Sequence, residues 1–519
     1  MLLKEAVNLT SCVGREQSQL VLEGDIIVPD TRPDMRTLLR TRAACQLERH
    51  EASSDRVNFY GKLVIKALYL AKGAEKPVHS LTLTAPIEDF IQLDGVDRDM
   101  WTDVTAEIAH MEYKMVNDRK VNYRAVIDIT ASAHAKVSPD VVVSIEGLSE
   151  SHLKKSRHSL CHIIANREDR FQVKNDLPLP PGKPGIRAIL QSDARISNKE
   201  IKVQSGRVSV SGELLIQSLY CGDDDGIAEF VEHETSFSGY IDVPGAKESM
   251  QADVTLRIAD LNVNIAADED GEDRVFSADA AIAATVRVQS QTEITVLEDA
   301  YHINQELHFT RETVKFPRLI CRNKNQCPIK EIIQLDDECP EILQIYQASG
   351  DLFVESIRLF EDRITVEGVI HADILYIARD DETPLYNHKA FIPYKQTIEV
   401  KGAAPGMEAS IEHAIDHIGF NMLSPREVEI RYLVCFTARI VDNRATDVIT
   451  HIEFTEMDKS VLDKMASITV YIVQSGDSAW SIAKKYNTSL DELLQVNDLD
   501  APEAIAPGQK LLVLKKIAS

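Results

Sequence analysis

The sequence predicts a multidomain, mainly β protein, in which three sandwich-like repeats precede one small domain of the order strand, helix, helix, strand. Similar stretches recur along the chain at a period of about 155 residues, and each alternates apolar and polar residues as strands do. From about residue 468 a different, partly helical pattern follows. At 519 residues the chain also exceeds what one hydrophobic core normally serves, so several domains are expected.

Each repeat contains one long anchor stretch, which runs from Arg56 to Tyr69, from Arg207 to Tyr220 and from Arg363 to Tyr376. Arginine, glycine and tyrosine hold the same spacing in all three copies. A proline lies 28 residues before the glycine each time, and a second glycine follows it by 33 or 34 residues. These residues are Pro33, Gly61 and Gly95 in the first copy, Pro184, Gly212 and Gly245 in the second, and Pro340, Gly368 and Gly402 in the third. The shared spacing predicts one fold in three copies.

The anchor stretch is predicted to be a strand with one buried face. In the first copy the apolar residues with a period of two are Val57, Phe59, Leu63, Ile65 and Tyr69. The three anchor tyrosines are therefore expected to be core residues. A glycine inside a strand indicates a bulge or a close backbone approach. The position five residues after the glycine is polar in every copy, so we expect it on a wetter face; it is Lys66, Gln217 or Asp373.

The spacings also predict the domain boundaries. We expect the repeats over residues 1–150, 151–305 and 306–454, each a separate folding unit, then a linker over 455–467 and the small domain over 468–516.

The small domain is predicted from its caps and periodicity. Residues 470–473 alternate like a strand, and Gly476, Asp477 and Ser478 turn the chain and offer oxygens to cap a helix. Ser489 and Glu492 have the spacing of a capping box, which opens a second helix. A short apolar stretch at 510–513 closes the domain as a strand.

This stretch resembles a LysM domain. The residues that carry the resemblance are Tyr471, Val473, Gly476, Asp477, Ser478, Trp480, Ile482, Ala483, Tyr486, Leu493, Asn497, Pro507, Gly508, Gln509 and Leu511. LysM domains generally bind N-acetylglucosamine units of peptidoglycan or chitin in a shallow groove. The resemblance places that groove between the loops 476–479 and 497–505, with Gly476, Asp477, Ser478, Ala479, Asn497, Leu499 and Ile505 as candidate ligand or partner contacts and Trp480 as support.

A structural interpretation of these residues stays open beside the functional one. Asp477 and Ser478 are also suited to capping the helix, and Trp480 is also suited to filling the small core.

The repeats are similar to the SPOCS domain of spore coat proteins. Three such repeats before a C-terminal LysM domain resemble the SipL-type coat morphogenetic proteins of endospore-forming bacteria. The resemblance implies a non-enzymatic scaffold in the mother-cell cytoplasm at the forespore surface. Its implied partners are the coat basement-layer ATPase and other spore coat proteins. The LysM domain is expected to be the docking site, with peptidoglycan as a weaker ligand.

Composition argues against one class of partner and indicates the compartment of the chain. The net charge is −25, and almost all of it belongs to the repeats, so nucleic acid is an unsuitable partner. Eight scattered cysteines without a C-x-x-C pair suit a reducing compartment. The first residues lack the pattern of a signal peptide, and no apolar run is long enough for membrane insertion, so we expect the chain to stay in the compartment that makes it.

Other patterns do not predict a chemical site. His413 and His417 have the spacing of a metal pair, and Asp268, Asp270 and Asp273 surround Gly271, but neither group has a complete ligand set. We therefore expect no catalytic residue, metal or cofactor. Two alternatives to the scaffold remain, namely a peptidoglycan-binding protein of the cortex or cell wall and a wall hydrolase with an unrecognised catalytic domain.

Overall fold

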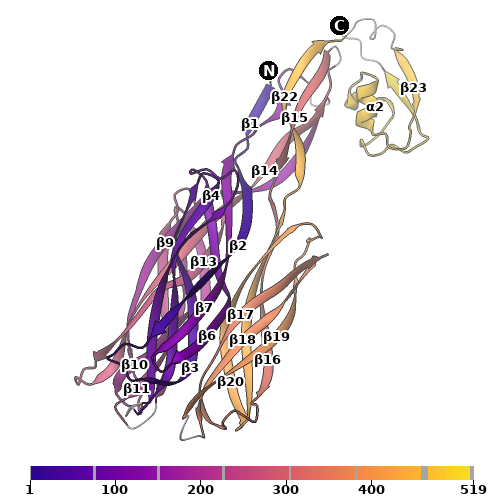
Figure 1. Cartoon of the computed structure of the whole chain (residues 1–519). Coiled ribbons are helices and arrows are strands. Elements are labelled where there is room, and N and C mark those ends of the chain that lie inside the picture. Colours follow the sequence, from indigo (N-terminus) through magenta and orange to yellow (C-terminus); the bar gives the residue numbers. More distant parts are fainter. Residues whose placement is uncertain are drawn as a thin grey trace.

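The computed structural model describes residues 2–73, 77–148, 152–224, 228–302, 305–379, 384–457 and 466–514. The interior of the expected linker, residues 458–465, lies outside these ranges. Figure 1 shows three β-rich repeats side by side, narrow strand pairs converging at one end of them, and a small domain with helices beside those pairs.

Each repeat is a sandwich of two three-stranded antiparallel sheets, as the sequence predicts. In the first repeat the strand orders are β3 (Met35–Ser53), β4 (Arg56–Ala71), β5 (Val78–Gln92) and β2 (Leu9–Ile27), β7 (Lys120–Val137), β6 (Trp101–Asn117). In the second they are β10 (Ile186–Gln204), β11 (Arg207–Gly222), β12 (Glu229–Asp242) and β9 (Leu153–Pro178), β14 (Asp273–Ala300), β13 (Gln251–Ala267). In the third they are β17 (Ile342–Phe360), β18 (Arg363–Ala378), β19 (Leu385–Glu399) and β16 (Arg318–Gln334), β21 (Glu427–Asp442), β20 (Glu408–Ser424).

The anchor stretch is the central strand of one sheet in every repeat. Its apolar face meets the apolar face of the second sheet, and the two together form one hydrophobic core per repeat. Tyr69, Tyr220 and Tyr376 are fully buried, which confirms their prediction as core residues. Each hydroxyl donates to the carbonyl oxygen of the repeat's spaced proline, at 3.1, 3.1 and 2.9 Å. The proline and the tyrosine are therefore two ends of one hydrogen bond.

The anchor glycines lie where the neighbouring strand bulges, as the sequence suggests. The pairing register shifts between Leu47 and Arg49 beside Gly61, and similar shifts occur in the other repeats. A Cβ atom on Gly61 or Gly368 would press into a backbone carbonyl oxygen of that strand. The second glycines serve another purpose, since Gly95, Gly245 and Gly402 have φ values of +81°, +91° and +79°, which favour glycine.

Each repeat also sends out a two-stranded arm beyond its sandwich. The first arm pairs β1 (Leu2–Ala6) with β8 (Asp140–Ile145), and the third pairs β15 (Gln305–Lys315) with β22 (Ala445–Glu456). In the second repeat, β9 and β14 run from the arm into the sandwich without a break. The arms bury apolar side chains against one another, among them Val141, Leu160, Val296 and Val448. Residues from all three repeats thus share this core.

The sandwiches meet around a common axis. Strand β10 contacts β5 of the preceding repeat, β17 contacts β12, and β3 contacts β19, so the contacts form a closed ring. Apolar residues of all three repeats pack at its centre; they are Leu68, Leu70, Val78, Leu190, Leu219, Cys221, Ala228, Tyr346, Leu375 and Leu385. Beside them, the buried Arg40 donates to the side-chain oxygens of Gln347 and Gln191, both at 2.8 Å. Each of these three residues lies 21 positions before its anchor glycine.

The polar position after the anchor glycine lies on the wetter face of the strand, as expected, since Lys66, Gln217 and Asp373 are half-buried whereas the apolar face is fully buried. Lys66 donates to the Ser192 carbonyl oxygen and to Asp193 of the second repeat, at 2.6 and 2.9 Å. Gln217 accepts from Gln347 at 2.7 Å. Two of the three polar residues thus make hydrogen bonds between repeats, while Asp373 accepts from Asn387 of its own repeat at 2.9 Å.

The last described residues form the predicted strand, helix, helix and strand. They are β23 (Ile468–Ile472), α2 (Ala479–Lys485), α3 (Leu490–Val496) and β24 (Lys510–Leu514), with β23 and β24 antiparallel. Both helices pack on one face of this two-stranded sheet.

Candidate functional site

The loop before α2 is held by its own side chains. Gly476 is exposed at φ +94°, and Ser478 caps the helix, because its hydroxyl accepts from the Ser481 N–H at 3.1 Å. Ser481 in turn accepts from the Ser478 N–H at 3.0 Å. Asp477 accepts from the Tyr471 hydroxyl at 2.7 Å and from the Gln474 N–H at 2.8 Å. These two hydrogen bonds, the backbone one first, lower the pKa of Asp477.

The second helix begins with only half of the predicted capping box. The Ser489 hydroxyl accepts from the Glu492 N–H at 3.2 Å. The Glu492 carboxylate instead accepts from the Thr488 hydroxyl at 3.5 Å. The cap is therefore formed as predicted on the serine side alone.

Asn497 joins the end of α3 to β24. Its amide N–H groups donate to the carbonyl oxygens of Leu493 and Leu512, at 2.8 and 2.7 Å, and its oxygen accepts from the Leu512 N–H at 2.6 Å. Of the other candidate groove residues, Ala479 is buried, while Leu499 and Ile505 are half-buried against the same core. The candidate residues thus line two loops around that core, and several of their polar atoms are already engaged in holding the loops.

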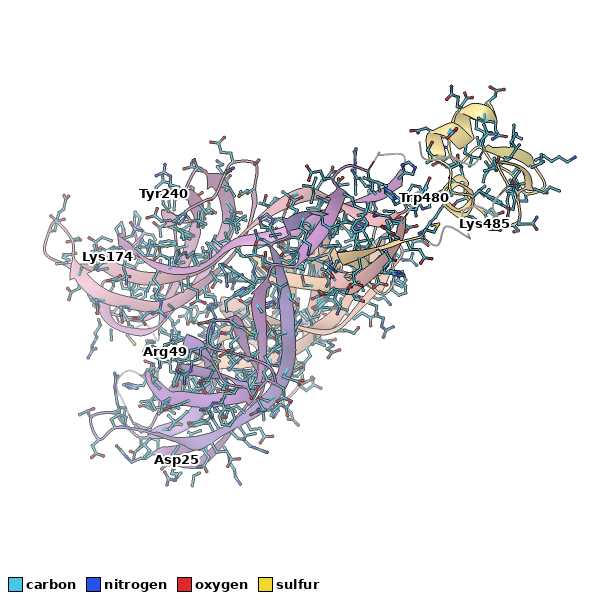
Figure 2. All side chains as sticks on the ribbon, turned by 90° about the horizontal axis from the view of Figure 1, so that it is seen from above. Asp25, Arg49, Lys174, Tyr240, Trp480 and Lys485 are labelled. Atoms are coloured by element: carbon cyan, nitrogen blue, oxygen red, sulfur yellow. The ribbon has the colours of Figure 1, made fainter. Side chains whose placement is uncertain are left out.

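Trp480 lies at the junction between this domain and the arm of the second repeat (Figure 2). It packs on the small core, and its indole N–H donates to Asp299 at 2.9 Å. Its ring meets the Tyr301 ring edge to face at 5.1 Å. The sequence placed Trp480 beneath the groove, and nothing in the sequence indicated a contact with residues about 180 positions earlier.

The outer face of the small sheet is apolar and exposed. Ile468, Val470 and Ile472 of β23 are 63%, 63% and 49% exposed, and Leu512 of β24, which pairs with Val470, is 37% exposed. The inward residues Tyr471 and Val473 are apolar as well. A strand with apolar residues on both faces is typical of a strand covered on both sides. Residues 468–473 carry this signal in the sequence, because Ile468, Val470 and Ile472 are apolar as well as Tyr471 and Val473.

The described residues contain no group of three or more His, Cys, Asp or Glu side chains placed to hold a metal ion. Among the helices in that part of the chain, none has the length and apolar character needed to cross a membrane.

Three β-sandwich repeats joined to a small domain with this topology define a modular, mainly β protein. A family model described as SipL, SPOCS domain, matches residues 26–116, 185–266 and 341–423, and a LysM domain model matches residues 471–513. The chain belongs to the SipL family, with three SPOCS segments and a C-terminal LysM domain. This family is non-catalytic, it implies a sporulation context, and LysM is a binding module associated with peptidoglycan.

Two curated relatives are similar to the LysM domain alone. The probable endopeptidase p60 of Listeria grayi is 44% identical over 55 residues, which are 11% of this chain and 10% of that protein. The probable autolysin SsaALP of Staphylococcus aureus is 51% identical over 51 residues, which are 10% of this chain and 18% of that protein. The chain thus covers a small part of either relative. No solved structure matches the chain.

Proposed function

We propose that the chain is a non-enzymatic scaffold of spore coat assembly and that its LysM domain is the docking site for another coat protein. The observation that carries this proposal is the exposed apolar face of β23 and β24. Neighbouring exposed aliphatic side chains on a small sheet favour a protein partner, because burying them from water stabilises a complex. A sugar chain needs mostly hydrogen-bonding groups.

The setting of this function is drawn from the family. SipL membership supports sporulation as the context. We place the chain in the mother-cell cytoplasm at the forespore surface, with the coat basement-layer ATPase as the first partner to test. The three repeats are further interaction domains for coat proteins, tied to one another through their arms and through the shared axial core.

A second candidate function is peptidoglycan binding in the cortex or cell wall. The LysM match favours it, and the similarity to an endopeptidase and an autolysin lies in the same domain. Its contacts would be the candidate groove residues, of which Gly476 and Ser478 are exposed. The two functions use different faces of the LysM domain, so one substitution distinguishes them.

The test compares the whole chain with its Val470→Asp variant. Val470 lies in the middle of the apolar face, so a carboxylate there should weaken binding to the coat ATPase at least tenfold. Val21→Asp on β2 is the matched control, because Val21 is an exposed valine, at 45%, on another edge strand. Binding to purified peptidoglycan is measured in parallel. Tight peptidoglycan binding that neither variant changes, together with no binding of the ATPase, would replace the scaffold by the second candidate.

A further inference from the structure

We propose that Asp299 and Tyr301, at the end of the second repeat's arm, are positioning residues that hold the LysM domain in one fixed orientation. The inference goes beyond the proposed function, since it applies whichever ligand the LysM domain binds. It rests on contacts between the end of β14 and helix α2, two segments that are about 180 residues apart in the chain.

Tyr301 is part of the LysM core, although it belongs to the second repeat. Only 5% of it is exposed, and it packs with Val473, Ala479 and Ile482. Its hydroxyl donates to the carbonyl oxygen of Thr488 at 2.7 Å, and Thr488 is fully buried in the turn between the two helices. Burial raises the pKa of Tyr301, so the hydroxyl remains a donor at neutral pH. Without this residue the carbonyl would lose its partner and the core would lose a ring.

Asp299 fixes the orientation of helix α2 relative to the arm. Its carboxylate accepts from the Trp480 indole N–H at 2.9 Å and from the Lys484 ammonium at 2.6 and 2.9 Å. Both donors lie on α2, four residues apart, and therefore on one face of the helix. An exposed ion pair alone would contribute little, but here the carboxylate also binds an indole that packs against Tyr301.

Residues of neighbouring arm segments add further contacts. Together with Asp299 and Tyr301, His152 and Phe309 form the surface that we call the seat of the LysM domain. His152, just before β9, meets the Tyr301 ring at 4.9 Å and an angle of 76°. The Lys484 ammonium lies over the Phe309 ring of β15 at 5.6 Å. The LysM domain therefore touches the arms of two repeats, and one rotation about the Tyr301 ring would break several of these contacts at once.

The seat determines which surfaces the LysM domain presents. Helix α2 faces the arms, whereas β23 lies on the far side of the domain (Figure 1). Figure 2 places Trp480 at the junction and Lys485 farther out. The apolar face of β23 is consequently presented away from the repeats at a constant distance. A partner bound there would be held in register with the repeats, and not on a freely turning domain.

The experiment uses the two tryptophans of the full chain as probes. Labelling with [15N]tryptophan gives two indole N–H signals in NMR, and Trp101 in the first repeat is the internal control. In the unchanged protein both signals should have the line width expected of groups that tumble with the whole molecule. In Tyr301→Ala, and in the Asp299→Ala/Tyr301→Ala pair, the Trp480 signal should shift and narrow several-fold while the Trp101 signal stays unchanged. In the double variant the LysM domain loses the hydrogen bonds of Tyr301 to Thr488 and of Asp299 to Trp480 and Lys484.

Two further variants distinguish loss of the seat contacts from a general destabilisation of the protein. Glu293→Ala removes an exposed carboxylate from the same strand, β14, away from the seat, and should leave both signals unchanged. Tyr301→Phe keeps the ring and removes the bond to Thr488, so it should give an intermediate line width. A Trp480 signal that is already narrow in the unchanged protein, or that keeps its width in the double variant, would overturn the inference. No partner is needed, so this outcome is independent of the docking test.

Discussion

At the scale of single residues, the repeat signature is explained by one hydrogen bond and one close approach. The spaced proline and tyrosine meet, so their constant separation in sequence reflects a constant geometry in the fold. The anchor glycine stands opposite a bulge, where the neighbouring strand leaves no room for a Cβ atom at Gly61 and Gly368 and little room at Gly212.

The anchor tyrosine gives the first prediction. Tyr376→Ala should lower the free energy of unfolding by about 3–5 kcal/mol, because it empties a fully buried ring site. Tyr376→Phe should cost about 1–2 kcal/mol, since it leaves the Pro340 carbonyl oxygen without its donor. Denaturant unfolding measures both. Equal effects of the two variants would show that the hydroxyl, and not the ring, carries the stability.

The anchor glycines give a second, graded prediction. A Cβ atom at Gly212 would lie 3.0 Å from the Ser197 carbonyl oxygen, which is tight but can be relieved by a small shift, whereas at Gly368 it would overlap the Phe353 carbonyl oxygen. Gly368→Ala should therefore lower the melting temperature clearly more than Gly212→Ala does. Thermal unfolding of the two variants checks the order, and the reverse order would contradict the role assigned to the bulge.

At the scale of elements, α2 shows how one short helix serves two purposes. Its cap closes the loop that resembles a glycan-binding loop, and its side chains Trp480 and Lys484 bind the arm. An element of only seven residues has little stability of its own, so its caps and its tertiary contacts determine whether it forms.

The helix cap gives the third prediction. Ser478→Ala should destabilise the LysM domain by about 1 kcal/mol, because the Ser481 N–H loses its acceptor, while Ser478→Gly should cost only a few tenths. Amide hydrogen exchange in the LysM domain of the full chain measures both. If Ser478 is instead a ligand contact, the variants should weaken peptidoglycan binding equally while exchange stays unchanged.

At the scale of the whole molecule, the repeats share cores with one another. Each sandwich has its own hydrophobic cluster, and the axis and the arms add clusters to which all three repeats contribute. The domain boundaries near residues 150 and 305 remain a prediction, although strands are interrupted there, after β8 and β14. Limited proteolysis checks them. Cuts should fall first in residues 455–467, and cuts inside the anchor strands would contradict the boundaries.

The charged residues beside the axial core give a prediction that depends on pH; among them Asp193 accepts from Lys66 at 2.9 Å and from Arg42 at 3.1 Å. Burial alone would raise the pKa of Asp193, but Arg42, Lys66 and Arg40 outweigh it and hold the pKa below its usual value. A carboxyl with a lowered pKa in the folded state stabilises above the unfolded value of about 3.9, and this stabilisation is lost as the pH falls through the folded value. Asp193→Asn should thus lower the melting temperature at pH 7, and its difference from the unchanged protein should shrink below about pH 4. A difference that stays constant across this range would exclude the charge as its cause.

By itself the sequence determined the class of fold, the number of repeats, the strands of each anchor and the LysM topology, because these depend on local periodicity, caps and spacing. Only the tertiary structure decided how the repeats meet. Arg40, Gln191 and Gln347 occupy equivalent positions, but no periodicity shows that three equivalent side chains of different repeats will touch each other. Periodicity likewise does not indicate that Asp299 and Tyr301 contact the LysM domain, whose sequence begins about 170 residues later. Contacts between distant segments depend on the shape and chemistry of the surfaces of folded domains, and these surfaces form only once each domain has folded.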